Sequence, residues 1–334
     1  MTQIRAAVAA VTFVVVAALG ATAAQGASDS RQLVKLDYAT SFGNFGRDAY
    51  AYVALKKGYF ARAGFDVKIV AGNGSEDDMK LIAAGKVDYA PVDFSAAVVA
   101  RANENLPVKI VSLVHQRTLS AEFAIAGGDI RTAKDLAGKQ IGDFPGSTTQ
   151  VMFPLFAKKV GIDPGSVTFV PANPQAEPAL LASGKLDAVG QFTVGVPLYE
   201  AVTKKKILSF AYAKYFPDLM GIGIAASDDK IDGNPAEARK FVAALNKGLA
   251  YSIAHPAEAG RILHSYQPLS DAKLAAAELR IMKRYVVSKQ TRTHGIGYID
   301  PKRVAKTIAI VNAGFHPKRH LKVRDVYAAG FIGR

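Results

Sequence analysis

The sequence predicts an α/β protein with two related lobes. Short apolar strands alternate with helices from residue 33 onward, a pattern typical of parallel strands joined by helices. One helix-to-strand junction also occurs twice: Leu-Ile-Ala-Ala-Gly-Lys-Val-Asp at 81–88 returns as Leu-Leu-Ala-Ser-Gly-Lys-Leu-Asp at 180–187, with five of eight residues identical. Chance is the alternative, since such junctions are common. Two copies favour two equivalent lobes and are too few for a solenoid.

Local signals place the elements of the first part of the chain. Alternating apolar and polar residues predict the first strand, and Tyr52 and Leu55 at near-helical spacing predict the first helix. Ser75 is expected to cap the next helix, because Asp77 and Asp78 then lie in its first turn, where the helix dipole favours carboxylates. We expect strands at 33–38, 65–70, 87–90 and 108–114 and helices at 48–60 and 75–85.

Similar signals organise the rest of the chain. Gly146 opens a helix that runs to Val160. Asn234 and Asp300 each precede a proline, which is typical of the first turn of a helix, and most of the chain beyond Asn234 is expected to be helical. The other expected elements are a short helix within 130–136 and strands at 138–142, 167–170 and 188–189.

The first 26 residues are expected to be a cleaved signal peptide. Arg5 supplies the positive start, Ala6 to Leu19 is an apolar run, and Ala21-Thr22-Ala23 provides a small-x-small cleavage pattern. The alternative is a membrane anchor, but the run holds roughly 14 strongly apolar residues, fewer than the ~20 that a spanning helix needs. We therefore expect an exported, free periplasmic protein.

Composition limits the classes of function. The chain is 50% hydrophobic and 21% charged, which is enough apolar material for a large core. It has no cysteine, which excludes disulfides, thiolate metal sites, cysteine nucleophiles and a lipid-modified N-terminal cysteine. The formal charge of +14 is dispersed along the chain, so we expect solvated basic faces rather than a nucleic-acid site. Such a field would still steer anionic ligands or anionic membrane surfaces.

A set of motifs, each weak alone, carries a family resemblance through its order and spacing. These motifs are Asp37-Tyr38, Tyr52 to Phe60, Ala63 to Val67, both Gly-Lys-x-Asp units, Asp135 to Lys139 and Gly146 to Thr148. Together they resemble the solute-binding proteins of ABC importers for nitrate, for taurine and other sulfonates, and for the pyrimidine precursor of thiamine. The resemblance covers nearly the whole mature chain.

The resemblance implies a type II periplasmic-binding-protein fold, in which a ligand cleft lies between two lobes joined by two crossover strands. The crossovers would fall near 122–126 and 221–226, with lobe 1 formed by 27–122 and 222–334 and lobe 2 by 123–221. The implied partners are a small-molecule ligand, an ABC permease and its ATPase. No cofactor and no nucleic acid are implied, and the protein would be a monomer.

Two alternatives belong to other functional classes. One is an exported adaptor with no small ligand, which would have a shallow or apolar cleft. The other is an enzyme. An enzyme group with the same fold makes the thiamine pyrimidine, using a cysteine-rich motif and a sacrificed histidine. The absence of cysteine and the signal peptide argue against that reading. We therefore expect a binding protein rather than an enzyme, with an anionic or zwitterionic ligand.

Candidate binding residues come from the rule that ligands of open α/β sheets bind at the C-terminal ends of strands. The loops at the predicted strand ends mix aromatic and polar residues, which is the chemistry of a small-molecule cleft. The candidates are Tyr38, Ser41, Phe42, Asn44, Phe45, Arg47, Asp93, Phe94, Ser95, His115, Gln116, Gly146, Ser147, Thr148, Thr149, Gln191, Phe192 and Thr193. We expect no catalytic residue and no metal ligand.

Specific roles follow for some candidates. The N–H groups and positive helix end at Gly146 to Thr149 suit a carboxylate, sulfonate or phosphate, although ordinary helix capping explains the same residues. Asp93 would accept hydrogen bonds from ligand N–H groups or cap the helix that follows it. The phenylalanines would stack on a ring or pack in the core, and His115 would be a hydrogen-bonding contact rather than a base. Tyr38 stands where the pyrimidine-binding branch usually has tryptophan, which weakens the case for a pyrimidine ligand.

Overall fold

The computed structural model describes residues 32–315 and 317–332. The expected signal peptide at 1–26 lies outside these residues. Within the described part of the chain, no helix is both long enough and apolar enough to cross a membrane.

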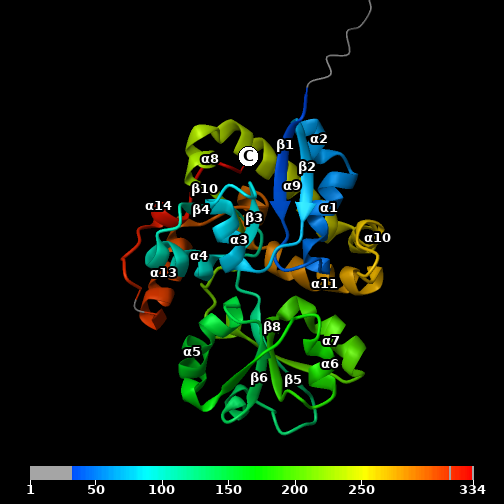
Figure 1. Ribbon diagram of the computed structural model, residues 1–334, viewed down its shortest axis with the longest axis vertical. Coiled ribbons are helices and arrows are strands. Elements are labelled where there is room, and N and C mark those ends of the chain that lie inside the picture. The colour runs from blue at the N-terminus through cyan, green and yellow to red at the C-terminus, as the bar shows by residue number, and fades with distance from the viewer. Residues whose placement is uncertain (1–31, 316, 333–334) are drawn as a thin grey trace, which may run out of the picture. The chain divides into compact units, whose positions relative to one another are not determined.

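The first lobe contains two small sheets (Figure 1). Strands β1 (Val34–Ala39) and β2 (Phe65–Val70) pair in parallel. In the second sheet, β10 (Ile222–Ser227) lies between β3 (Ala90–Asp93) and β4 (Val108–Leu113) and runs antiparallel to both. A backbone hydrogen bond of 3.0 Å from Ala39 to Tyr89 links the two sheets, so β1 leads directly toward β3. The helices between these strands are α1 (Ala49–Lys56), α2 (Tyr59–Ala63), α3 (Ser75–Ala83) and α4 (Phe94–Glu104).

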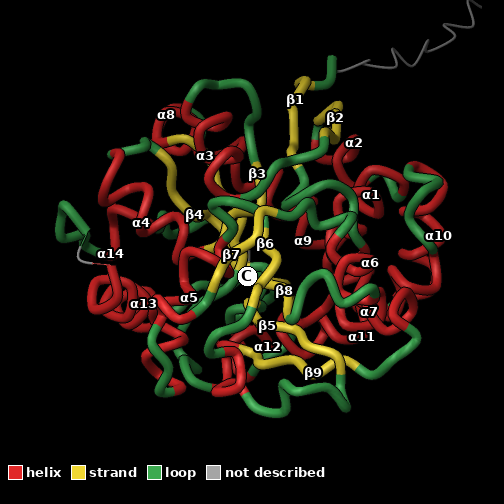
Figure 2. The backbone as a smooth tube through the Cα atoms, turned by 60° about the horizontal axis from the view of Figure 1, so that its bottom comes forward, coloured by secondary structure: helices red, strands yellow, loops and turns green. Residues whose placement is uncertain are grey.

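The second lobe is built on one five-stranded sheet with the order β7-β6-β8-β5-β9. Its strands are β5 (Ser120–Ile125), β6 (Gln140–Asp143), β7 (Thr168–Pro171), β8 (Ala188–Phe192) and β9 (Ile207–Ala211). The helices are α5 (Thr148–Val160), α6 (Glu177–Ala182) and α7 (Val196–Thr203), with α5 on one side of the sheet and α6 and α7 on the other (Figure 2). Both lobes thus mix parallel and antiparallel strands.

The chain after β10 is helical, as expected, and it packs on the first lobe. Helix α9 packs against α1 and α2, α10 against α1 and α11, and α13 against α4. The bounds are α8 (Asp228–Gly233), α9 (Pro235–Ala254), α10 (Pro256–Tyr266), α11 (Ala272–Val286), α12 (Lys289–His294), α13 (Pro301–Phe315) and α14 (Val323–Val326). Asn234 caps α9 by accepting a hydrogen bond from the Glu237 N–H, with Pro235 at the first position, so this start signal is confirmed.

Two segments connect the lobes, and they are hydrogen bonded to each other. The backbone N–H groups of Val114 and His115 donate to the Ile222 carbonyl, both at 2.9 Å, and Thr118 donates to Leu219 at 2.9 Å. The connections therefore lie just before β5 and just before β10. The positions expected for them, 122–126 and 221–226, fall mostly inside these two strands, each of which pairs within one lobe.

The repeated junction is confirmed at the level of individual hydrogen bonds. In each copy a glycine with positive φ ends the helix, Gly85 at 65° and Gly184 at 73°. In each copy the aspartate that follows also accepts a hydrogen bond from a backbone N–H of a neighbouring strand. The Asp88 carboxylate accepts from Asp37 at 2.7 Å, and the Asp187 carboxylate accepts from Gln140 at 2.8 Å. The two lobes therefore share the same local construction.

Some local predictions are wrong in detail. The helix expected at 48–60 is two helices, because Gly58 adopts a left-handed conformation with φ 65° between them. Ser75 is the first residue of α3 rather than its cap, and its hydroxyl accepts a hydrogen bond from the Asp93 N–H at 2.9 Å. Strand β3 begins at Ala90, three residues later than expected. Contacts with distant residues decide the last two cases, whereas the left-handed Gly58 is a local helix-ending signal.

Candidate functional site

A cavity of about 230 Å³ lies between the lobes. The first lobe contributes the loop after β1, the turn that begins α3, and one residue of β10. The second lobe contributes the segment from β6 into α5 and the end of β8. Its lining residues are Ser41, Phe42, Arg47, Asn73, Gly74, Ser75, Glu76, Asp77, Asp143, Phe144, Pro145, Gly146, Ser147, Thr148, Thr149, Pro174, Gly190, Gln191, Phe192 and Ile222. This is the placement expected for open α/β sheets, at the C-terminal ends of parallel strands.

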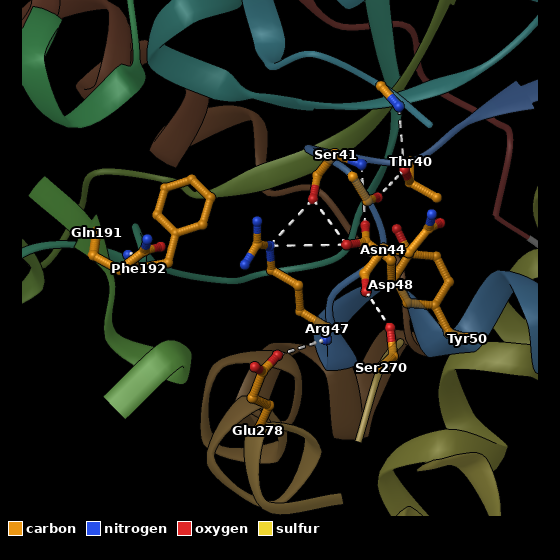
Figure 3. A network of polar contacts seen from close by, with 12 residues as sticks. Thr40, Ser41, Asn44, Arg47, Asp48, Tyr50, Gln191, Phe192, Ser270 and Glu278 are labelled. Atoms are coloured by element: carbon orange, nitrogen blue, oxygen red, sulfur yellow. Dashed lines mark hydrogen bonds and ion pairs between the residues drawn. The ribbon is translucent and has the colours of Figure 1, made fainter. Parts of the chain in front are cut away.

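Arg47 is the single cation among the described residues that line the cavity. Its side chain is only 5% exposed, and its guanidinium points toward Phe192 and Gln191 (Figure 3). The Nε group donates to the Ser41 hydroxyl at 3.2 Å. The guanidinium carbon lies 4.4 Å from the centre of the Phe45 ring and 5.1 Å from that of Phe192, within cation–π range. Within the described part of the chain, neither terminal Nη group has a hydrogen-bond partner.

Two buried carboxyl groups hold the backbone around Arg47 (Figure 3). Asp48 accepts hydrogen bonds from the Ser41 N–H at 3.0 Å and the Ser41 hydroxyl at 3.1 Å. Glu278, on α11, accepts from the Arg47 N–H at 3.1 Å. Burial raises the pKa of Asp48, and it raises the pKa of Glu278 to about 7, while the Arg47 charge opposes both shifts. These contacts fix the loop and leave the outer edge of the guanidinium free to meet a ligand.

Phenylalanines from both lobes meet at the cavity. Phe42, from the loop after β1, and Phe144, from the end of β6, pack edge to face with ring centres 5.1 Å apart. Phe192, at the end of β8, adds a third ring. Aromatic rings prefer such offset or edge-to-face contacts, and a planar ligand can join them.

The N-terminus of α5 faces the cavity, as expected. Ser147 caps the helix by accepting a hydrogen bond from the Gln150 N–H at 3.0 Å, and both Thr148 and Thr149 line the cavity. An acidic side chain of the first lobe already approaches this helix end, because a Cβ on Gly146 would lie 3.1 Å from the Glu76 carboxylate. The positive end of α5 is therefore partly compensated by the protein itself, and Arg47 is the stronger anion-binding group.

Three carboxyl groups are buried in the second lobe: Glu122 on β5, Asp143 on β6, which also lines the cavity, and Glu177 on α6. Each has one oxygen without a hydrogen-bond partner among the described residues. The other oxygens of Glu122 and Glu177 accept hydrogen bonds from tyrosine hydroxyls at 2.6 and 2.7 Å. Burial raises the pKa of Glu122 to about 7 and that of Glu177 to about 8, and it raises the Asp143 pKa well above its usual value. These groups favour their neutral forms.

The cavity brings together half of the sequence-predicted site residues. These are Ser41, Phe42, Arg47, Gly146, Ser147, Thr148, Thr149, Gln191 and Phe192. They come from the loops after β1, β6 and β8.

The other predicted residues do not line this cavity. Asp93 caps α4 by accepting from the Ser95 N–H at 2.8 Å, and Phe94 is fully buried behind it. The Tyr38 hydroxyl pairs with the Tyr50 hydroxyl at 2.9 Å in the core. Of the remainder, Asn44 and Phe45 line a neighbouring hollow, His115 and Gln116 lie buried in the first connection, and the Thr193 hydroxyl donates to the Leu119 carbonyl.

Sequence reasoning missed the turn from Asn73 to Asp77, which forms the start of α3. The signal was available, because the Gly72-Asn73-Gly74 turn directly follows a predicted parallel strand. It also missed Asp143 and the residues next to it, which follow β6 in the same way. Pro174, Gly190 and Ile222 carry no sequence signal that distinguishes them from structural residues.

Comparison with known proteins identifies the family. Residues 48–259 match the family model described as NMT1/THI5 like. The chain belongs to this family. It is 28% identical over 290 residues to the riboflavin-binding protein RibY of Chloroflexus aurantiacus, covering 84% of this chain and 81% of that protein. It is 23% identical to the 4-amino-5-hydroxymethyl-2-methylpyrimidine phosphate synthase THI13 of Saccharomyces cerevisiae, covering 73% of this chain and 74% of that enzyme.

A solved structure supports the fold. The aliphatic sulphonate binding protein SsuA of Escherichia coli superposes with a TM-score of 0.68 at 13% identity, covering 88% of this chain and 92% of that one. At this identity the likeness shows the fold alone. The expected type II periplasmic-binding-protein fold with two lobes is confirmed.

Proposed function

We propose that this protein is the extracytoplasmic solute-binding component of an ABC importer. It captures a small anionic or zwitterionic organic molecule between its lobes and delivers it to a permease and its ATPase. The observation that carries this proposal is Arg47, a buried cation with free Nη groups at the edge of an interlobe cavity. A signal peptide at 1–26 and release into the periplasm belong to the same proposal.

Closure of the lobes would be the mechanism. Phe192 and Phe144, from the second lobe, approach Arg47 and Phe42, from the first. A ligand that touches both sets of residues binds the closed arrangement better than an open one, so it shifts the population toward closure. The permease would then recognise the closed arrangement of the lobes.

Catalysis is the second candidate, because the yeast relative is named a synthase. Three features favour binding instead. The chain contains no cysteine, and the relative RibY of Chloroflexus aurantiacus is named a riboflavin-binding protein. The histidine expected in the cleft, His115, does not line the cavity, and burial and the nearby Arg47 charge lower its pKa to about 3, which leaves it neutral.

A thermal-shift screen tests the proposal. The mature chain is heated with sulfonates, nitrate, pyrimidines and carboxylates, and a ligand that binds the folded state raises the melting temperature. Arg47→Ala should abolish the shift, because the anion loses its counter-charge in a buried site. Arg280→Ala is the matched control, since Arg280 is an exposed residue of α11 outside the cavity. Equal shifts in wild type and Arg47→Ala would contradict this site.

A further inference from the structure

The structure assigns a narrower ligand class to this cavity: a planar, single-ring carboxylic acid with one negative charge. This inference rests on the proposed function, because it concerns the ligand of the same cavity. It combines the free edge of one guanidinium, three aromatic rings and two acidic side chains, Glu76 and Asp77, that limit the ligand charge.

The free edge of Arg47 matches a carboxylate. Its Nε is held by the Ser41 hydroxyl, which orients the guanidinium plane. Neither neighbouring acid takes the terminal donors: Glu278 accepts from the Arg47 backbone N–H, and Asp48 is 3.9 Å from Nε. The two Nη groups therefore remain as a pair of planar donors. A carboxylate presents two oxygens in one plane with matching spacing, which makes a bidentate pair.

The aromatic rings match a flat ring next to that carboxylate. Phe192 lies over the guanidinium, and Phe42 and Phe144 meet edge to face in the lining of the same cavity. An aryl ring attached to a carboxylate on Arg47 would contact Phe192 and the Phe42–Phe144 pair together. Because these rings come from both lobes, a flat ring would also favour closure.

The size of the cavity favours a small ligand. Its volume of about 230 Å³ is below the ~300–1,000 Å³ typical of sites for drug-sized ligands. A single substituted ring fits this limit better than a fused multi-ring system.

The acids that line the cavity limit the ligand to one negative charge. Glu76 and Asp77, at the start of α3, line the same cavity as the single cation. Glu76 is paired with Lys80 at 2.5 Å, but Asp77 has no ion pair among the described residues. A second ligand carboxylate would have to lie near these groups, and like charges at close range are repelled.

Isothermal titration calorimetry on the mature wild-type chain tests this inference, after unfolding and refolding have removed any retained ligand. The probes are benzoate, cyclohexanecarboxylate, terephthalate and benzenesulfonate. Benzoate should bind with one site per chain. Cyclohexanecarboxylate, which has the same charge but no aromatic ring, and terephthalate, which has a second carboxylate, should each bind at least about tenfold more weakly. Benzenesulfonate should also bind more weakly, because its three oxygens are not coplanar.

Two variants test the roles of the Arg47 guanidinium and the Phe192 ring separately. Arg47→Lys should weaken benzoate binding by about tenfold or more, since an ammonium cannot make the bidentate pair. Phe192→Leu should weaken benzoate and leave cyclohexanecarboxylate nearly unchanged. Arg280→Lys is the control for the first variant and should change nothing.

Two results would overturn the inference, and they are distinguishable. If benzoate does not bind while a sulfonate, nitrate or a pyrimidine does, the ligand class is wrong and the proposed function stands. If none of these compounds binds and no small molecule leaves the chain on unfolding, both the ligand class and the proposed function are contradicted.

Discussion

At the scale of single residues, the buried acids of the second lobe have a direct thermodynamic consequence. Glu122, Asp143 and Glu177 are packed with two tyrosines, Tyr199 on α7 and Tyr212 after β9. Burial is the largest cause of each raised pKa, neighbouring carboxylates add to the shift for Asp143 and Glu177, and no basic side chain is among the causes. The folded state therefore holds protons that the unfolded state releases near pH 4.5.

The stability of the protein should consequently fall as the pH rises. A carboxyl with a raised folded pKa contributes stability that is complete below its unfolded pKa and lost as the pH rises through its folded pKa. For Glu122 this stability is lost between about pH 4.5 and about pH 7, and for Glu177 between about pH 4.5 and about pH 8. Urea unfolding of wild type between about pH 5 and pH 9 should show this loss.

Between about pH 5 and pH 9, the free energy of unfolding of Glu122→Gln should fall by about 3 kcal/mol less than that of wild type. This difference is the energetic equivalent of the raised pKa of Glu122. Glutamine stays neutral and keeps an oxygen that can accept from the Tyr212 hydroxyl. Glu104→Gln is the control, because Glu104 is exposed at the end of α4. A wild-type stability that is flat or rises across this pH range would contradict the assignment of neutral acids.

At the scale of elements, helix α9 approaches α1 so closely that a glycine is required. A Cβ on Gly248 would lie 2.3 Å from the Tyr50 carbonyl oxygen and 2.8 Å from the Ala54 Cβ. Alanine normally favours a helix over glycine by about 1 kcal/mol. Here the clash with the backbone of α1 should dominate.

Gly248→Ala should therefore destabilise the protein by about 1–3 kcal/mol, the usual cost of overpacking. The measurement is the urea midpoint. Gly233→Ala in α8 is the control, because a Cβ there meets nothing within 4 Å. Gly248→Ala with a midpoint equal to or above that of wild type would show that α9 does not pack on α1 as described.

The repeated junction also makes an element-scale prediction. The Asp187 carboxylate accepts from the Gln140 N–H at the start of β6. Asp187→Ala should cost about 1 kcal/mol, the usual net value of one such hydrogen bond, and Asp187→Asn should cost less, because it keeps an acceptor oxygen. Stability is measured by urea unfolding. If the two variants lose the same free energy of unfolding, the hydrogen bond to Gln140 does not explain why this junction has an aspartate in both copies.

At the scale of the whole molecule, much of the fold could be predicted because its signals are local. Alternation predicted β1, cap residues predicted α5 and α9, and the repeat at 81–88 and 180–187 predicted two lobes. The late start of β3 could not be predicted, because pairing with the distant strand β10 decides it. The break at Gly58 was missed although a left-handed glycine is a common local end of a helix.

The candidate site could be predicted in part, for a different reason. The strand-end rule found the loops after β1, β6 and β8, which remain open to the cavity. It failed at Asp93 because α4 begins directly after β3, so the strand end is covered by its own helix. It failed at His115 because the chain after β4 becomes the connection between lobes. A sequence shows where strands end but not which ends stay uncovered.

We propose that Arg47 anchors a small acid between the two lobes. Native mass spectrometry tests it most directly, on wild type and Arg47→Ala after incubation with the small-molecule fraction of a bacterial extract. Wild type should carry a small acidic compound, released on mild denaturation, and Arg47→Ala should carry none. A bare wild-type chain, or the same compound on both proteins, would contradict it.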